Sequence, residues 1–83
     1  MITIRLFGSL RLKTGLKEMS VYASDVAEVC RLLARATGCN IKEFKKCIFF
    51  INGKEAGKKA SLSEGDELVV LAPPQGGLAK QGE

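Results

Sequence analysis

The chain contains no histidine and no tryptophan, and only two prolines and three cysteines occur among its 83 residues. The absence of histidine removes most zinc sites, imidazole acid–base chemistry and nucleophiles that depend on a neighbouring imidazole. No C-x-x-C pair occurs, and an odd number of separated cysteines fits a reducing compartment rather than a disulfide framework. We therefore expect no metal site and no bound cofactor, and we do not expect the domain to be an enzyme by itself.

Long hydrophobic runs are also absent. The longest apolar stretches, Cys47–Ile51 and Leu68–Ala72, are far shorter than the about 20 residues that a membrane-spanning helix needs. The N-terminus shows no secretory signal pattern. These features predict a cytoplasmic protein with no membrane partner, and the apolar content of 46% with 27% charged residues is typical of one globular domain.

The net charge is +4, which permits an acidic partner surface. Lysines near Phe49 and Phe50 raise the alternative of nucleic-acid binding. Adjacent strand residues point to opposite faces, so at most one of these two rings could stack on bases. We interpret the lysines as solvated surface and expect no nucleic-acid partner.

Alternating and compact apolar patterns predict five extended segments. They are Met1–Phe7, Leu16–Tyr22, Cys47–Ile51, Glu55–Ala60 (a short strand or loop) and Glu67–Ala72. Asn52-Gly53 is a strong hairpin-turn signal, because both residues tolerate positive φ. The segment Leu10–Gly15 is predicted to be a loop or wide turn.

One main helix is predicted at Val26–Thr37. Asp25 is a favourable N-cap with Glu28 three residues later, and Gly38 suits the left-handed position that ends a helix. A short helical turn is expected within Asn40–Lys46. The order of elements predicts an α+β fold of the ubiquitin-like β-grasp type, a mixed four- to five-stranded sheet with its first and last strands adjacent, crossed by one main helix. Residues 1–75 would form this domain and residues 76–83 a flexible tail.

An informative motif lies where the domain meets the tail. Pro73 and Pro74 stop strand pairing because they lack N–H donors, and Gly76-Gly77 has no side chains and wide backbone freedom. Such a tail can thread into a narrow slot of another protein. A diglycine after a small domain therefore suggests a reactive carboxyl end.

In this order the residues resemble the small subunit of molybdopterin synthase (MoaD), within the MoaD/ThiS group of ubiquitin-like sulfur carriers. The resemblance rests on the opening Ile2–Arg11, the Asn52-Gly53 hairpin, the turn Leu62–Leu68 and the Pro73-Pro74-x-Gly76-Gly77 end. It covers nearly all of residues 1–77. The prolines and the Phe-Gly-x-Leu-Arg segment are more similar to MoaD than to the thiamine sulfur carrier ThiS.

The resemblance implies a sulfur carrier for molybdopterin or tungstopterin biosynthesis. A ubiquitin-activating-type adenylyltransferase (MoeB-like), using ATP and magnesium, would adenylate the Gly77 carboxylate. A sulfurtransferase would then convert it to a thiocarboxylate, which serves a MoaE-like large subunit. Gly76 would let the tail lie extended, Pro73, Pro74 and Gln75 would set its exit direction, and Phe7 matches a docking position on a partly apolar sheet face.

Six residues follow Gly77, so this function requires a processing protease to cleave between Gly77 and Leu78. Two alternatives stay open. The chain could be a ubiquitin-like modifier that is conjugated to target lysines through Gly77, or a β-grasp binding module that never loses its tail.

Overall fold

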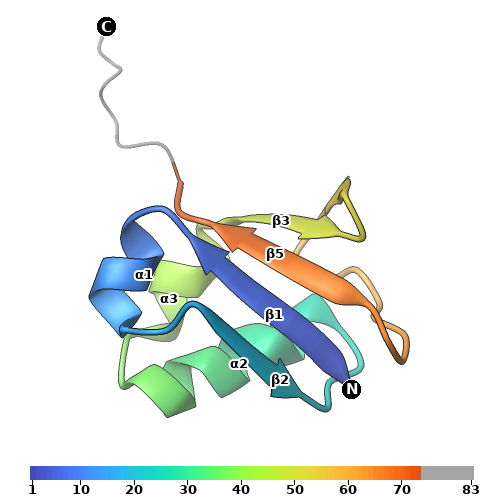
Figure 1. Ribbon diagram of the computed structural model, residues 1–83, viewed down its shortest axis with the longest axis horizontal. Coiled ribbons are helices and arrows are strands. Elements are labelled where there is room, and N and C mark those ends of the chain that lie inside the picture. The colour runs from blue at the N-terminus through green and yellow to red at the C-terminus, as the bar shows by residue number, and fades with distance from the viewer. Residues whose placement is uncertain (74–83) are drawn as a thin grey trace, which may run out of the picture.

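Five strands form one mixed sheet in the order β2-β1-β5-β3-β4. The computed structural model describes residues 1–73. Its strands are β1 (Ile2–Phe7), β2 (Glu18–Val21), β3 (Ile48–Ile51), β4 (Lys54–Ala56) and β5 (Glu67–Leu71). Strands β1 and β5 run parallel in the middle of the sheet, and the other neighbours pair antiparallel (Figure 1). The predicted adjacency of the first and last strands is confirmed.

In the described part of the chain three helices accompany the sheet: α1 (Ser9–Thr14), α2 (Val26–Thr37) and α3 (Ile41–Lys45). The main helix α2 lies across one face, and α1 and α3 gather at the end of the sheet where β1 and β5 finish (Figure 1). The prediction of a loop at Leu10–Gly15 was wrong, since most of this segment is α1. A six-residue helix has too few turns for a periodic pattern, and only Leu10 of α1 is buried.

The ends of α2 coincide with the predicted ones because both are fixed by local contacts. Asp25 Oδ1 accepts a hydrogen bond from Glu28 N at 2.7 Å, and Gly38, at φ 77°, donates from its N–H to Ala34 O at 2.9 Å. The Glu28 carboxylate accepts from Ser24 N at 2.9 Å, one residue before the position expected in a capping box. An N-cap of this kind stabilises a helix by about 1 kcal/mol.

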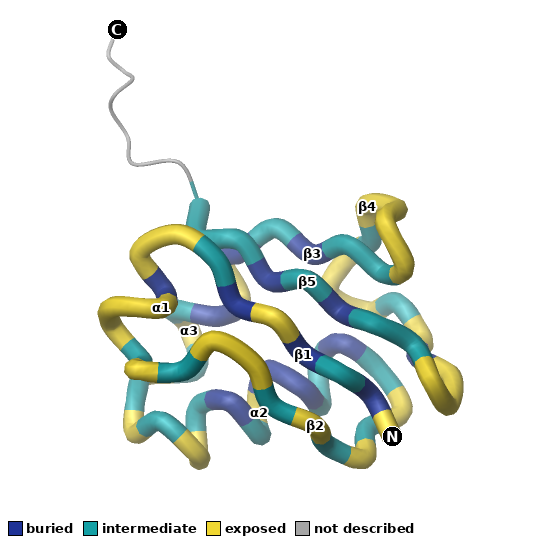
Figure 2. The backbone as a smooth tube through the Cα atoms, viewed as in Figure 1, coloured by how far each residue is buried: buried dark blue, intermediate teal, exposed yellow. Residues whose placement is uncertain are grey.

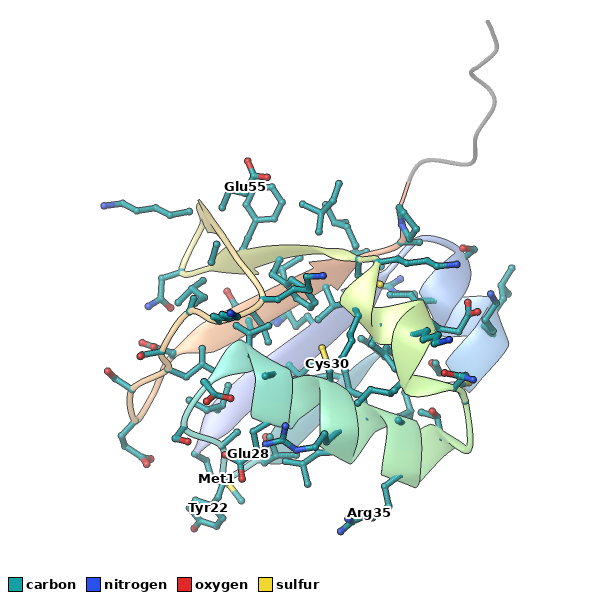
Figure 3. The ribbon with its side chains drawn as sticks, turned by 180° about the vertical axis from the view of Figure 1, so that it is seen from behind. Met1, Tyr22, Glu28, Cys30, Arg35 and Glu55 are labelled. Atoms are coloured by element: carbon teal, nitrogen blue, oxygen red, sulfur yellow. The ribbon has the colours of Figure 1, made fainter. Side chains whose placement is uncertain are left out.

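The core lies between α2 and the inner face of the sheet, and buried positions recur along β1, β5 and α2 (Figure 2). Alternate residues of β1, β5 and β3 meet the apolar side of α2 and the ring of Phe44 from α3. These buried side chains are Ile2, Ile4, Leu6, Phe49, Leu68 and Val70 from the sheet, and Val26, Val29, Cys30 and Leu33 from α2. Cys30 points from α2 toward the sheet (Figure 3). On β3, Phe49 rather than its neighbour Phe50 faces the helix.

The β3–β4 hairpin turns at Asn52 and Gly53, which have φ angles of 51° and 86°, so this turn prediction is confirmed. Asn52 also joins the hairpin to the start of β5: its Oδ1 accepts from Glu67 N at 3.0 Å and its Nδ2 donates to Asp66 at 2.9 Å. Within residues 1–73, no helix combines the length and the apolar character that crossing a membrane requires. The predicted domain end at residue 75 and the flexible tail 76–83 lie outside the described residues and stay predictions.

Candidate functional site

The sheet face opposite α2 carries five apolar side chains on three adjacent strands. The β1–β5–β3 registers place Phe7, Leu71 and Ile48 in one row, and Val69 and Phe50 in the next. All five are half-buried, and their sequence neighbours on each strand belong to the core. We call these five residues the open-face patch. Among residues 1–73 no helix covers it (Figure 1).

Charged residues border the open-face patch. Arg5 of β1 makes an ion pair with Glu67, with Nε 2.7 Å from Oε2, and lies 3.9 Å from a carboxylate oxygen of Glu18 on β2. On the other side Glu55 pairs in register with Phe50 and points away from α2 (Figure 3). An apolar centre with a charged rim is the usual composition of a protein-binding surface.

Arg11 fixes the position of Phe7, the docking residue that the sequence indicated. The Arg11 guanidinium carbon lies 4.7 Å from the centroid of the Phe7 ring. The Nε of the same side chain donates to Leu6 O at 2.7 Å, at the end of β1. A cation over a ring face is attracted by its negative quadrupole, so Arg11 orients the ring at the edge of the open-face patch.

The tail leaves the sheet beside Phe7. In the parallel register Phe7 lies opposite Leu71, after which Ala72 and Pro73 follow as half-buried residues. Gly8 turns the chain from β1 into α1 at φ 73° and ψ −150°, and a Cβ added to Gly8 would lie 3.5 Å from the Ala72 Cβ. The structure therefore places Pro73 two residues beyond the register partner of Phe7, at the same end of the sheet, and both are predicted partner-docking residues.

The remaining predicted site residues lie outside the described residues. These are Pro74, Gln75, Gly76, Gly77 and Leu78. Their predicted roles in setting the exit direction, in adenylation and thiocarboxylation, and in processing stay predictions.

A hollow of about 360 Å³ lies at the base of the tail, on the helix side of the sheet. We call it the tail-base hollow. Residues lining it come from α1, from α3 and its C-cap, and from the segment just after β5; they include Ser9, Lys13, Glu43, Lys46, Ala72 and Pro73. No part of the sequence pattern indicated it, because its walls come from three segments that only the fold brings together.

One ion pair spans the tail-base hollow. Lys13 Nζ of α1 lies 2.8 Å from Glu43 Oε1 of α3. The hydrogen bond and the charge of Lys13 hold the pKa of Glu43 below its ordinary value, and the charge of Lys46 acts in the same direction. The pKa of Lys13 is raised by the same contact with Glu43.

Two of the cysteines behave as core residues. Burial raises the pKa of Cys47 to about 11, and its thiol donates to Glu43 O at 3.2 Å. Burial also raises the pKa of Cys30. Both thiols stay protonated at neutral pH and are poor nucleophiles. Within residues 1–73, no three side chains of the metal-binding types lie close enough to hold an ion.

Sequence reasoning placed Phe7 on the outer face of its strand but did not group it with Ile48, Phe50, Val69 and Leu71 in one surface. Alternation within β3 and β5 could have separated the outer from the inner residues. The rows across the strands could not be inferred, because they depend on registers between segments that are distant in the sequence.

Several solved structures share this arrangement. Small archaeal modifier protein 1 from Methanosarcina acetivorans superposes with a TM-score of 0.76 at 22% identity, over 92% of this chain and 95% of that protein. A provisionally named molybdopterin converting factor subunit 1 from Pyrococcus furiosus superposes with a TM-score of 0.71 at 17% identity, over 87% of this chain and 95% of that protein. The third structure is the complex of subunits 1 and 2 of the molybdopterin-converting factor from Helicobacter pylori. Its matching chain superposes with a TM-score of 0.65 at 22% identity, over 92% of this chain and 97% of that chain. These likenesses confirm the β-grasp fold.

No curated protein matches the chain by sequence. The family comparison is more specific, because the model of the ThiS family matches residues 4–77. This range contains nearly all of the described domain and ends at the second glycine of the tail. The chain therefore belongs to the ThiS family, whose members are small ubiquitin-like sulfur carriers and modifiers rather than enzymes.

Proposed function

We propose that this chain is a cytoplasmic sulfur carrier for molybdopterin or tungstopterin biosynthesis, with Gly77 as the residue that bears sulfur once residues 78–83 have been removed. The observation that carries this proposal is the family match, which runs to Gly77 and stops there. The sequence resemblance to MoaD and the similarity to two molybdopterin converting factor subunits support a role in pterin cofactor biosynthesis rather than in another sulfur pathway.

The chemistry needs little from the chain except a free glycine carboxylate in a thin, extended tail. The carboxylate oxygen attacks the α-phosphorus of ATP in the active site of a MoeB-like adenylyltransferase, and pyrophosphate leaves. A sulfur nucleophile supplied by a sulfurtransferase then attacks the acyl carbon, and AMP leaves with the oxygen. Because the partners supply ATP, magnesium and the catalytic groups, a chain without histidine can serve as their protein substrate.

The open-face patch is the surface through which we propose that the activating enzyme and a MoaE-like large subunit dock in turn. Its five side chains are half-buried and apolar, so covering them removes apolar surface from water. The tail leaves at the edge of this patch, beside Phe7. A partner seated on the patch is therefore placed to receive the tail. The Helicobacter pylori structure is a complex of subunits 1 and 2, so a chain of this fold binds a second subunit there.

A second candidate function is a ubiquitin-like modifier conjugated through Gly77. The similarity to a small archaeal modifier protein favours it. Both functions begin with adenylation of Gly77, so they differ only in the nucleophile that attacks next: sulfur for a carrier, a lysine amine for a modifier.

Intact-mass analysis of the chain from its native cell separates these functions. Loss of residues 78–83 with a sulfur-for-oxygen exchange supports the carrier, whereas a ladder of larger conjugates supports the modifier. A full-length, unreacted chain in cells with abundant activating enzyme would reject both. As a control, Gly77→Phe should fold normally and carry no sulfur, because the side chain would not enter the channel that receives the tail. Transfer of sulfur from the wild-type thiocarboxylate to a pterin precursor on the MoaE-like subunit then tests whether the carrier serves molybdopterin or tungstopterin biosynthesis.

A further inference from the structure

The tail-base hollow carries an unbalanced positive charge. It contains two lysines, Lys13 and Lys46, and one carboxylate, that of Glu43. Lys13 lies 2.8 Å from Glu43, whereas Lys46 has no ion pair within 4 Å among residues 1–73. Lys46 is exposed, so water solvates its ammonium group in the free chain.

The hollow lies where a partner that takes up the tail would cover it. Ala72 and Pro73 form one of its walls, and they are the residues from which the tail departs. The open-face patch and the hollow lie on opposite sides of this departure point. A protein that takes up the tail and closes over both sides would remove water from Lys46. An ammonium group that loses its water without gaining an anion costs several kcal/mol.

We propose that the tail-base hollow receives an acidic side chain of the protein that activates the tail, with its carboxylate binding Lys46 Nζ. This inference rests on the proposed function, because it assigns the hollow to the activating partner. One carboxylate brings the charge of the three side chains from +1 to zero. A dianionic group such as phosphate would instead leave a net charge of −1 in the hollow. The net charge of +4 on the whole chain permits an acidic partner surface as well.

The test measures activation of the chain trimmed to end at Gly77, using the ubiquitin-activating-type enzyme of the same organism and ATP–pyrophosphate exchange. We expect Lys46→Glu to raise the KM for the carrier by about tenfold or more with kcat unchanged, and Lys46→Met to raise it about threefold. Lys59→Glu is the matched control. It makes the same change in charge on the loop after β4, and we expect less than a twofold effect.

Each outcome has one meaning. If wild type is activated and Lys46→Glu behaves like Lys59→Glu, the inference about the hollow is wrong and the proposed function stands. If wild type is not activated, the proposed function fails and the inference falls with it. If the chain alone self-associates in sedimentation and Lys46→Glu abolishes this, the occupant is a second copy and the inference is overturned. Unfolding of each variant in urea verifies that it is folded.

Discussion

Replacement of Gly8 by alanine measures the backbone strain at the turn between β1 and α1, next to the point where the tail leaves the sheet. Gly8 adopts φ 73° and ψ −150°, a region that only glycine occupies readily. The added Cβ would lie 3.5 Å from the Ala72 Cβ, an ordinary contact, so the loss of stability comes from the backbone rather than from a clash. Strain of this type costs about 1–3 kcal/mol.

Gly57→Ala is the matched control for this prediction. Gly57 does not have positive φ, and no described atom would lie within 4 Å of its added Cβ. Both variants lose the same glycine flexibility in the unfolded chain, a change that by itself stabilises by about 0.4–1 kcal/mol. The difference between the two variants is therefore the strain alone.

Urea unfolding measures that difference. With a slope of about 1 kcal/mol per molar urea, the midpoint of Gly8→Ala should lie about 1–3 M below that of Gly57→Ala. In thermal unfolding, each kcal/mol corresponds to about 4–8 °C for a domain of this size. Equal midpoints for the two variants would refute the argument that Gly8 is held in a conformation closed to alanine.

Three further predictions concern separate parts of the molecule. Phe50→Ser should weaken binding to the activating enzyme by about tenfold or more in a titration, because it removes an apolar contact of the open-face patch, whereas Tyr22→Ser, exposed and outside the patch, should not. Cys47 should react with iodoacetamide about 100-fold more slowly in the native chain than in urea, since a pKa of about 11 against an ordinary 9.0 lowers the thiolate population by that factor; equal rates would contradict this. The pKa of Asp66 is lowered by hydrogen bonds from Ser63 N and the Asn52 side chain, so its contribution to stability is present above the unfolded pKa and is lost as pH falls through the folded value. Asp66→Asn should therefore show a flatter loss of stability below about pH 4 than wild type in urea titrations.

The sequence was sufficient for elements whose ends are set by neighbouring residues. Asp25 and Gly38 set the two ends of α2 through contacts within one turn. Asn52-Gly53 forms the hairpin turn through its own backbone preferences. Helix α1 was missed because its six residues are held by the burial of Leu10 against residues distant in the sequence. Local preference alone is weak over such a length.

Only the part of the candidate site that depends on a single strand could be predicted from the sequence. The phase of Phe7 against Ile4 and Leu6 was enough to place it on the outer face of β1. The union of Phe7 with four residues of β3 and β5 depends on strand registers, and the tail-base hollow depends on how α1 and α3 pack at the end of the sheet. Neither can be inferred from spacing along the chain.

The parallel pairing of β1 with β5 also governs when the protein can fold during synthesis. Among residues 1–73, β1 is the first strand and its central neighbour β5 is the last, so the inner face of β1 stays incomplete until β5 has left the ribosome. Contacts between segments this distant form late, because loop closure must precede them. A prematurely terminated chain that lacks β5 therefore also lacks the complete open-face patch. If the proposed function holds, such a product could neither be charged at Gly77 nor compete through the open-face patch for the proposed activating enzyme.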